Sequence, residues 1–139
     1  MSLANARKHL DLAAEQWDRA CTDSWEPVDS ASCVTNVFYA YENLIVAVAE
    51  ARDLPWAKNH YKKADLAKKL FESKIVKADL SDELLRLNGL RKDVSYGEPG
   101  FELANEDLEG LVSDLETFMN EVDAIVSKLE EAEEAENHA

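Results

Sequence analysis

Residues 30–52 read SASCVTNVFYAYENLIVAVAEAR, and this stretch decides the fold. Its large apolar side chains recur at intervals of three or four residues, the spacing that places them on one face of a helix. They are Val34, Val37, Phe38, Tyr41, Leu44, Ile45 and Val48, flanked by Cys33, Ala40, Val46, Ala47 and Ala49. Because this apolar surface is so wide, we expect a helix capped by Ser30 and ending near Arg52 to be the most buried in the protein.

The rest of the 139-residue chain shows the same periodicity in four further segments. We expect helices from the N-cap Ser2 to Ala20 or Cys21, from Asn59 to Lys77, from Ser81 to the stop at Gly97–Gly100, and from Asn105 to Ala135. Pro27 and Pro55 lie in the other breaks. The pattern predicts an all-α fold, an antiparallel up-and-down bundle of four to five helices. We assign one domain to residues 1–129, followed by an acidic, frayed tail of residues 130–139.

Each of the later helices has its own inward face. We expect it to hold Tyr61, Leu66, Leu70, Phe71 and Ile75 in the third helix, and Leu84, Leu87, Arg91 and Val94 in the fourth. In the last helix an apolar stripe runs from Leu108 to Leu129. That stripe has two interpretations, an intramolecular core or a seat for a second subunit.

Charge is distributed unevenly along the sequence. The formal net charge is −14, yet residues 58–77 carry seven lysines against two acidic residues. An acidic protein does not favour tight non-specific binding to a long duplex, because phosphate contacts need cations. The lysine segment either contacts nucleic acid locally or faces water near the acidic segment, and we favour the second interpretation.

Several common functional motifs are missing from the sequence. It contains no Walker loop, GxGxxG, HExxH or GxSxG motif, and its three histidines are far apart. We therefore expect no metal site and no cofactor. Cys21 and Cys33 form no CxxC pair, so we expect two buried, reduced thiols. No apolar run is long enough to cross a bilayer and nothing at the start resembles a signal peptide, so we expect a cytoplasmic protein without membrane attachment.

Arg91 is the polar residue that fits a pure packing pattern least. It shares the helix face of Leu84 and Leu87, and a buried guanidinium needs a partner. The candidates on the second helix are Asn36, Tyr39, Tyr41, Glu42 and Asn43. Arg91 either ties two helices together or holds a phosphate or oxyanion, with the first alternative favoured. Tyr96 and His60 are the other candidate cleft residues, although packing is the favoured explanation for Tyr96 and solvent exposure or capping for His60.

Three segments resemble the HEPN superfamily of small helical bundle proteins. They are VFYAYENL at residues 37–44, Asn59–His60, and LRKDVSYG at residues 90–97, and the resemblance covers about residues 31–129. It implies an up-and-down bundle that forms a homodimer, with two arginine-bearing helices meeting in a cleft. Active members are metal-independent ribonucleases with an R-x(4–6)-H motif. Others are binding or regulatory modules, often paired with a nucleotidyltransferase-type antitoxin.

The sequence departs from the active pattern after Arg91. Tyr96, Gly97 and Glu98 stand where the histidine belongs, and a tyrosine of pKa near 10 is a poor proton shuttle at neutral pH. We therefore expect a HEPN-like homodimer that is a non-catalytic nucleotide- or RNA-binding or regulatory module, in a toxin–antitoxin pair. The alternatives are a weak metal-independent ribonuclease using Arg91 and Tyr96, or an acidic bundle for protein–protein interaction. Tyr39, Glu42, Asn43 and His60 are the expected supporting residues.

Overall fold

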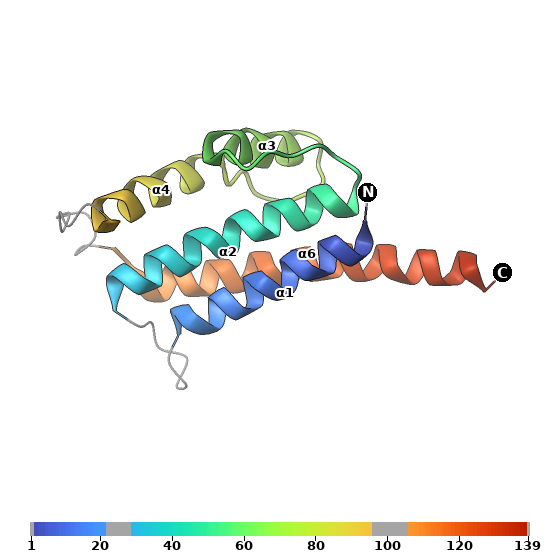
Figure 1. The fold of residues 1–139 in the computed structure, drawn as a ribbon, viewed down its shortest axis with the longest axis horizontal. Helices are drawn as coiled ribbons and strands as arrows, with labels where there is room; N and C mark the ends of the chain where they lie inside the picture. Colours follow the sequence, from blue (N-terminus) through green and yellow to red (C-terminus); the bar gives the residue numbers. More distant parts are fainter. Residues whose placement is uncertain (1, 22–28, 96–105, 139) are drawn as a thin grey trace.

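The computed structural model describes residues 2–21, 29–95 and 106–138, and these form an all-α bundle. Its helices are α1 (Leu3–Ala20), α2 (Ser30–Ala51), α3 (His60–Glu72), α4 (Ser81–Ser95) and α6 (Leu108–Asn137). Helices α1, α2, α4 and α6 alternate in direction along the chain, with α2 in the middle (Figure 1). The predicted fold class is thereby confirmed. The expected breaks at Pro27 and Gly97–Gly100 and the expected helix start at Asn105 lie outside the described residues.

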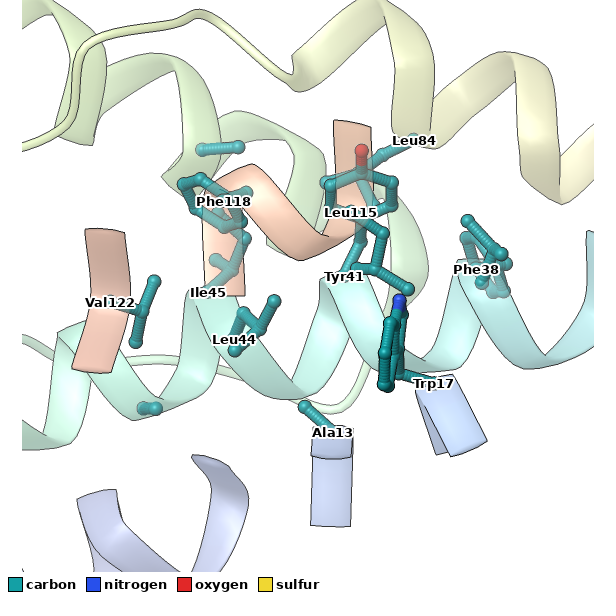
Figure 2. Close-up of a cluster of buried hydrophobic side chains, with 14 of the residues drawn as sticks. Ala13, Trp17, Phe38, Tyr41, Leu44, Ile45, Leu84, Leu115, Phe118 and Val122 are labelled. Carbon is teal, nitrogen blue, oxygen red and sulfur yellow. The ribbon is translucent and has the colours of Figure 1, made fainter. Parts of the chain in front are cut away.

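Helix α2 is the centre of the core, as its sequence predicts. It contacts α1, α3, α4 and α6, and fourteen of its residues are buried. Figure 2 shows Phe38, Tyr41, Leu44 and Ile45 of α2 among side chains from the other helices. Burial of each such side chain contributes about 1.5–3 kcal/mol. The polar residues described below lie on the face of α2 that is directed toward α3 and α4.

Side-chain caps explain where the helices begin. The Ser2 hydroxyl accepts a hydrogen bond from the Asn5 amide at 3.0 Å, as expected for the first helix. Helix α2 is capped one residue earlier than expected, because the carboxylate of Asp29 accepts from the Ser32 amide at 3.0 Å and Ser30 is already helical. The Asn59 side chain accepts from two amides at the start of α3, which fixes the first helical residue as His60.

Helix α3 is shorter than expected, ending at Glu72 rather than Lys77. Lys74 adopts a left-handed backbone with φ of 60°, and the Ile75 amide donates back to the Leu70 carbonyl at 2.9 Å, so the chain turns away. Two expected inward positions are wrong, since Tyr61 is 56% and Phe71 41% exposed. Leu66 and Leu70 are buried as expected, and Ala64 and Ala67 complete the buried face of α3, because small alanines let the helix pack closely.

Helix α6 extends beyond the rest of the bundle at its C-terminal end (Figure 1). It begins at Leu108, capped by Asp107, and continues to Asn137 through the segment for which we expected a frayed tail; fraying in solution stays a prediction. Arg7 of α1 reaches this end of α6. Its guanidinium contacts Asp123 at 2.9 Å, Ser127 at 3.2 Å and Glu130, joining the first helix to the last.

Both cysteines are free thiols buried in the helical core, Cys33 completely. None of the helices in the described part of the chain has the length and apolar character to cross a membrane. The expected cytoplasmic location stays a prediction.

Candidate functional site

Arg91 lies half-buried on α4 and faces α2. Its Nη1 donates to the Tyr39 hydroxyl at 3.3 Å, and its guanidinium carbon lies 5.4 Å from the ring centre of Phe38 and 5.6 Å from that of Tyr39. Of the five partners expected on the second helix, the structure therefore supplies Tyr39. The helical register places Arg91 as predicted, and its stem and guanidinium are held against two aromatic rings.

Asn88 is the second partner of Arg91, and sequence reasoning missed it. Its Oδ1 accepts from Nη2 of Arg91 at 2.8 Å and from Nε at 3.3 Å, while the side chain is only 3% exposed. The signal was present in the sequence, because Asn88 lies four residues after Leu84 and three before Arg91, on the same helix face. A buried amide oxygen orients the guanidinium without neutralising it.

Glu42 is the one buried carboxylate of α2, only 4% exposed. Its Oε2 lies 2.6 Å from Nδ1 of His60, and its Oε1 lies 3.6 Å from Nζ of Lys63. The expectation that Glu42 partners Arg91 is wrong, because His60 and Lys63 from the first turn of α3 occupy both oxygens. Lys63 was missed, although it stands one helical turn after His60 and shares its face.

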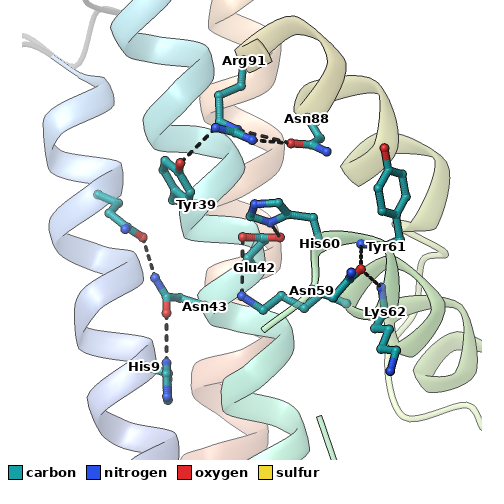
Figure 3. A network of polar contacts seen from close by, with 12 residues as sticks. His9, Tyr39, Glu42, Asn43, Asn59, His60, Tyr61, Lys62, Asn88 and Arg91 are labelled. Atoms are coloured by element: carbon teal, nitrogen blue, oxygen red, sulfur yellow. Dashed lines mark hydrogen bonds and ion pairs between the residues drawn. The ribbon is translucent and has the colours of Figure 1, made fainter. Parts of the chain in front are cut away.

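The two sets of contacts meet at Phe38. The His60 ring packs edge-on against Phe38 at 5.3 Å, and Arg91 lies over the same ring. Figure 3 shows Arg91 with Tyr39 and Asn88, and His60 with Glu42. We call Tyr39, Glu42, His60, Lys63, Asn88 and Arg91 the Arg91 cluster. It holds two permanent cations and one carboxylate, with a histidine that adds a further positive charge when protonated. The cluster is therefore cationic in a protein of net charge −14.

Other expected site residues lie elsewhere. Asn43 is turned toward α1, where its amide nitrogen donates to Gln16 at 2.9 Å and its oxygen lies 2.9 Å from Nδ1 of His9. Its expected support of Arg91 is therefore wrong, because Gln16 and His9 of α1 bind both polar atoms of its side chain. Asn36 donates to a backbone carbonyl of its own helix. Tyr96 and the side chain of Val94 lie outside the described residues.

The lysines near α3 face water. Lys58, Lys62, Lys68, Lys69, Lys74 and Lys77 are exposed, and none makes an ion pair with a carboxylate in the part of the chain that the structure describes. This agrees with the solvent-facing interpretation. Within residues 2–21, 29–95 and 106–138, no three histidine, cysteine or acidic side chains come together as metal ligands would.

Comparisons with known proteins assign no family to this arrangement. The chain matches no protein-family model, no curated protein and no solved structure.

Proposed function

We propose that the Arg91 cluster binds the phosphate group of a nucleotide or of single-stranded RNA. One observation carries this proposal. Among the described residues the Arg91 guanidinium contacts an amide oxygen, a phenol and two aromatic rings, but no carboxylate. By contrast, Arg7 and Arg86 each bind two carboxylates. An oriented arginine without a counter-ion is suited to a phosphate, which its planar fork can bind with two hydrogen bonds.

The surroundings of Arg91 support an anionic ligand. Lys63 and His60 lie on the α3 side of the cluster, and the exposed lysines continue along that helix. Tyr39, the partly exposed ring beside Arg91, is suited to stack an unpaired base. The overall negative charge disfavours a long duplex, so a mononucleotide or short single strand is the better ligand.

The resemblance to HEPN proteins supports a homodimer as part of this proposal, with a nucleotidyltransferase-type antitoxin as partner. In such a dimer the Arg91 clusters of two subunits would share one cleft. Sedimentation equilibrium of the purified chain tests this point directly. A dimer that dissociates when Arg91 is changed to Ala supports the shared cleft, and a monomer at every accessible concentration contradicts it.

Binding is tested by titrating a fluorescent adenine mononucleotide and a labelled oligouridine while recording fluorescence anisotropy. We expect Arg91→Gln to weaken binding about tenfold or more, because a charged hydrogen bond is lost. Arg19→Gln, an equal charge change at an exposed position of α1, is the matched control. Equal affinity of the two variants would contradict the proposal and leave an acidic bundle for protein–protein interaction.

A second candidate is a metal-independent ribonuclease, and the Glu42–His60 pair favours it. A carboxylate that holds Nδ1 of a histidine leaves Nε2 to accept a proton from a ribose 2′-hydroxyl. The 2′-oxygen would then attack the phosphorus and the bond between phosphorus and the 5′-oxygen would break, with the 5′-oxygen leaving with the proton that Nε2 had accepted, while Arg91 binds the phosphate. In this candidate the proton is accepted by His60. The ribonuclease alternative drawn from the sequence had used Tyr96 together with Arg91.

The ribonuclease candidate is tested with oligouridine cleavage in the presence of a chelator. We expect His60→Gln and Arg91→Gln each to lower cleavage at least 100-fold, in the range of a lost acid–base group. Arg19→Gln retains the wild-type rate. Equal cleavage by all variants would come from a contaminating nuclease and would exclude the ribonuclease candidate. It would not affect the phosphate-binding proposal.

A further inference from the structure

A cavity separate from the Arg91 cluster lies between the start of α4 and the first half of α6, with Tyr41 of α2 in its wall. Its volume is about 540 Å³. Its apolar wall includes Tyr41, Phe118 and Leu111, and the rings of Tyr41 and Phe118 lie 5.9 Å apart. The rim is charged and holds Glu83, Glu106, Asp107, Asp114 and Glu121 together with Lys77 and Arg86. None of these residues belongs to the Arg91 cluster.

The hydroxyl of Tyr41 is the unusual group in this cavity. The side chain is only 3% exposed, yet its oxygen has no hydrogen-bond partner among the described residues. In the same part of the chain every fully buried side-chain nitrogen or oxygen has a partner, so the Tyr41 oxygen must be reachable from the cavity that it lines. Figure 2 shows the hydroxyl of Tyr41 pointing away from Leu44 and Trp17. Burial and the nearby Asp114 and Glu83 carboxylates raise the pKa of Tyr41, so the hydroxyl stays protonated at neutral pH.

The rim has more negative charge than its own cations neutralise. Arg86 binds Glu83 at 2.6 Å and Glu106 at 2.7 Å, so these two carboxylates are paired. The three others have no ion pair with a described residue; they are Asp107, which caps α6, and Asp114 and Glu121 within that helix. Asp107 caps the Gly110 amide and Glu121 accepts from the Lys77 amide, whereas Asp114 has no hydrogen bond to the described residues.

The spacing of these carboxylates fits an extended ligand better than a metal ion. Asp107, Asp114 and Glu121 are seven residues apart, which separates neighbours by about 10 Å along one face of the helix. A divalent cation needs several ligands within about 2.6 Å of one point. No such group of acidic, histidine or cysteine side chains occurs in the described ranges. A linear ligand with several spaced positive charges can place one charge beside each carboxylate.

We propose that this cavity binds a linear polyamine, with its ammonium groups on Asp114 and the neighbouring α6 carboxylates. One ammonium donates a hydrogen bond to the free lone pairs of the Tyr41 hydroxyl. The methylene chain between the charges lies on Phe118 and Leu111, where apolar contact and the attraction of a cation to an aromatic ring both favour it. Lys77 and Arg86 mark the ends of the site, because they repel further positive charge.

The experiment is an isothermal titration of the full chain with spermidine at low salt. We expect Asp114→Asn to weaken binding about tenfold or more, through the loss of a charged contact. Tyr41→Phe is expected to weaken it about two- to tenfold while leaving the urea midpoint unchanged, because the hydroxyl that it removes has no partner in the protein. Glu131→Gln, which removes one exposed charge at the far end of α6, is the matched control.

Non-specific attraction to an acidic protein gives a different result. In that case Asp114→Asn and Glu131→Gln weaken spermidine binding equally and Tyr41→Phe leaves it unchanged, and this outcome overturns the proposal. Butylamine, which has one ammonium group on the same kind of chain, is the second probe. The proposal requires it to bind much more weakly than spermidine in the wild type, and equal affinity would contradict the role of the spaced carboxylates.

Discussion

Nδ1 of His60 lies 2.6 Å from Oε2 of Glu42, which joins the first residue of α3 to the middle of the most apolar helix. Glu42 is almost fully buried, and Lys63 is 3.6 Å from its other oxygen. A buried carboxylate is costly unless it is paired and hydrogen-bonded. This contact therefore holds the start of α3 against α2, and the His60 ring packs on Phe38, the same ring over which Arg91 lies.

Replacing Glu42 with Gln should lower the free energy of unfolding by about 1–3 kcal/mol. The side-chain volume is kept, but the charged contacts to His60 and Lys63 are lost and the partly buried lysine has no counter-ion. Urea denaturation followed by circular dichroism measures the change. Glu133→Gln, at an exposed position of α6, is the control and should unfold at the wild-type midpoint. Identical midpoints for all three proteins would show that the contact contributes nothing.

Stability should fall at alkaline pH because of Cys33. Burial raises the pKa of this thiol from 9.0 to about 11. Between these values the unfolded chain has lost a proton that the folded chain keeps, so the free energy of unfolding falls by about 1.4 kcal/mol per pH unit. The full contribution is present below pH 9 and is lost as the pH rises through 11.

Urea unfolding of the wild type and Cys33→Ala from pH 8 to pH 11 measures this dependence. The variant should show a shallower decline above pH 9, whatever its stability at pH 8. Some decline remains, because burial also raises the pKa of Tyr41. Parallel curves for the two proteins would show that the thiol does not titrate as its burial requires.

Two helical glycines should respond oppositely to substitution by alanine. A Cβ at Gly89 of α4 would meet no atom within 4 Å, so Gly89→Ala should raise the free energy of unfolding by about 0.5–1 kcal/mol. A Cβ at Gly110 of α6 would lie 2.9 Å from Cγ of Asp107, the side chain that caps this helix. Loss of that cap costs about 1 kcal/mol and should cancel the gain. Thermal unfolding of both variants measures the two effects. An equal rise of the unfolding midpoint in Gly110→Ala and Gly89→Ala would contradict the prediction.

The fold was predictable because its determinants are local. The apolar spacing of α2 and the cap at Ser2 act within one or two helical turns, so the sequence displays them directly. The third helix was predicted too long, because its end depends on the left-handed backbone at Lys74, a conformation that no glycine signals. Tyr61 and Phe71 were predicted to be buried because aromatic side chains are usually apolar core residues. In the structure both are exposed, and alanines make up half of the buried face of α3.

The candidate sites were predictable only in part. The register of Arg91 predicted its inward face, but the choice among five partners depended on how α4 is rotated against α2. Arg91 binds Tyr39, whereas Glu42 binds His60 of α3. The open hydroxyl of Tyr41 could not be predicted, because it results from the packing of α6 against α2 far along the chain.

The contact of Arg7 with the end of α6 has a consequence for how the protein is made. Its partners stand 116 to 123 residues later in the chain. At about 5–20 residues per second, a ribosome needs on the order of ten seconds to add them after Arg7. Arg7 therefore stays without these partners for that time, and α1 and α6 are joined by this contact only after the second half of α6 has been made.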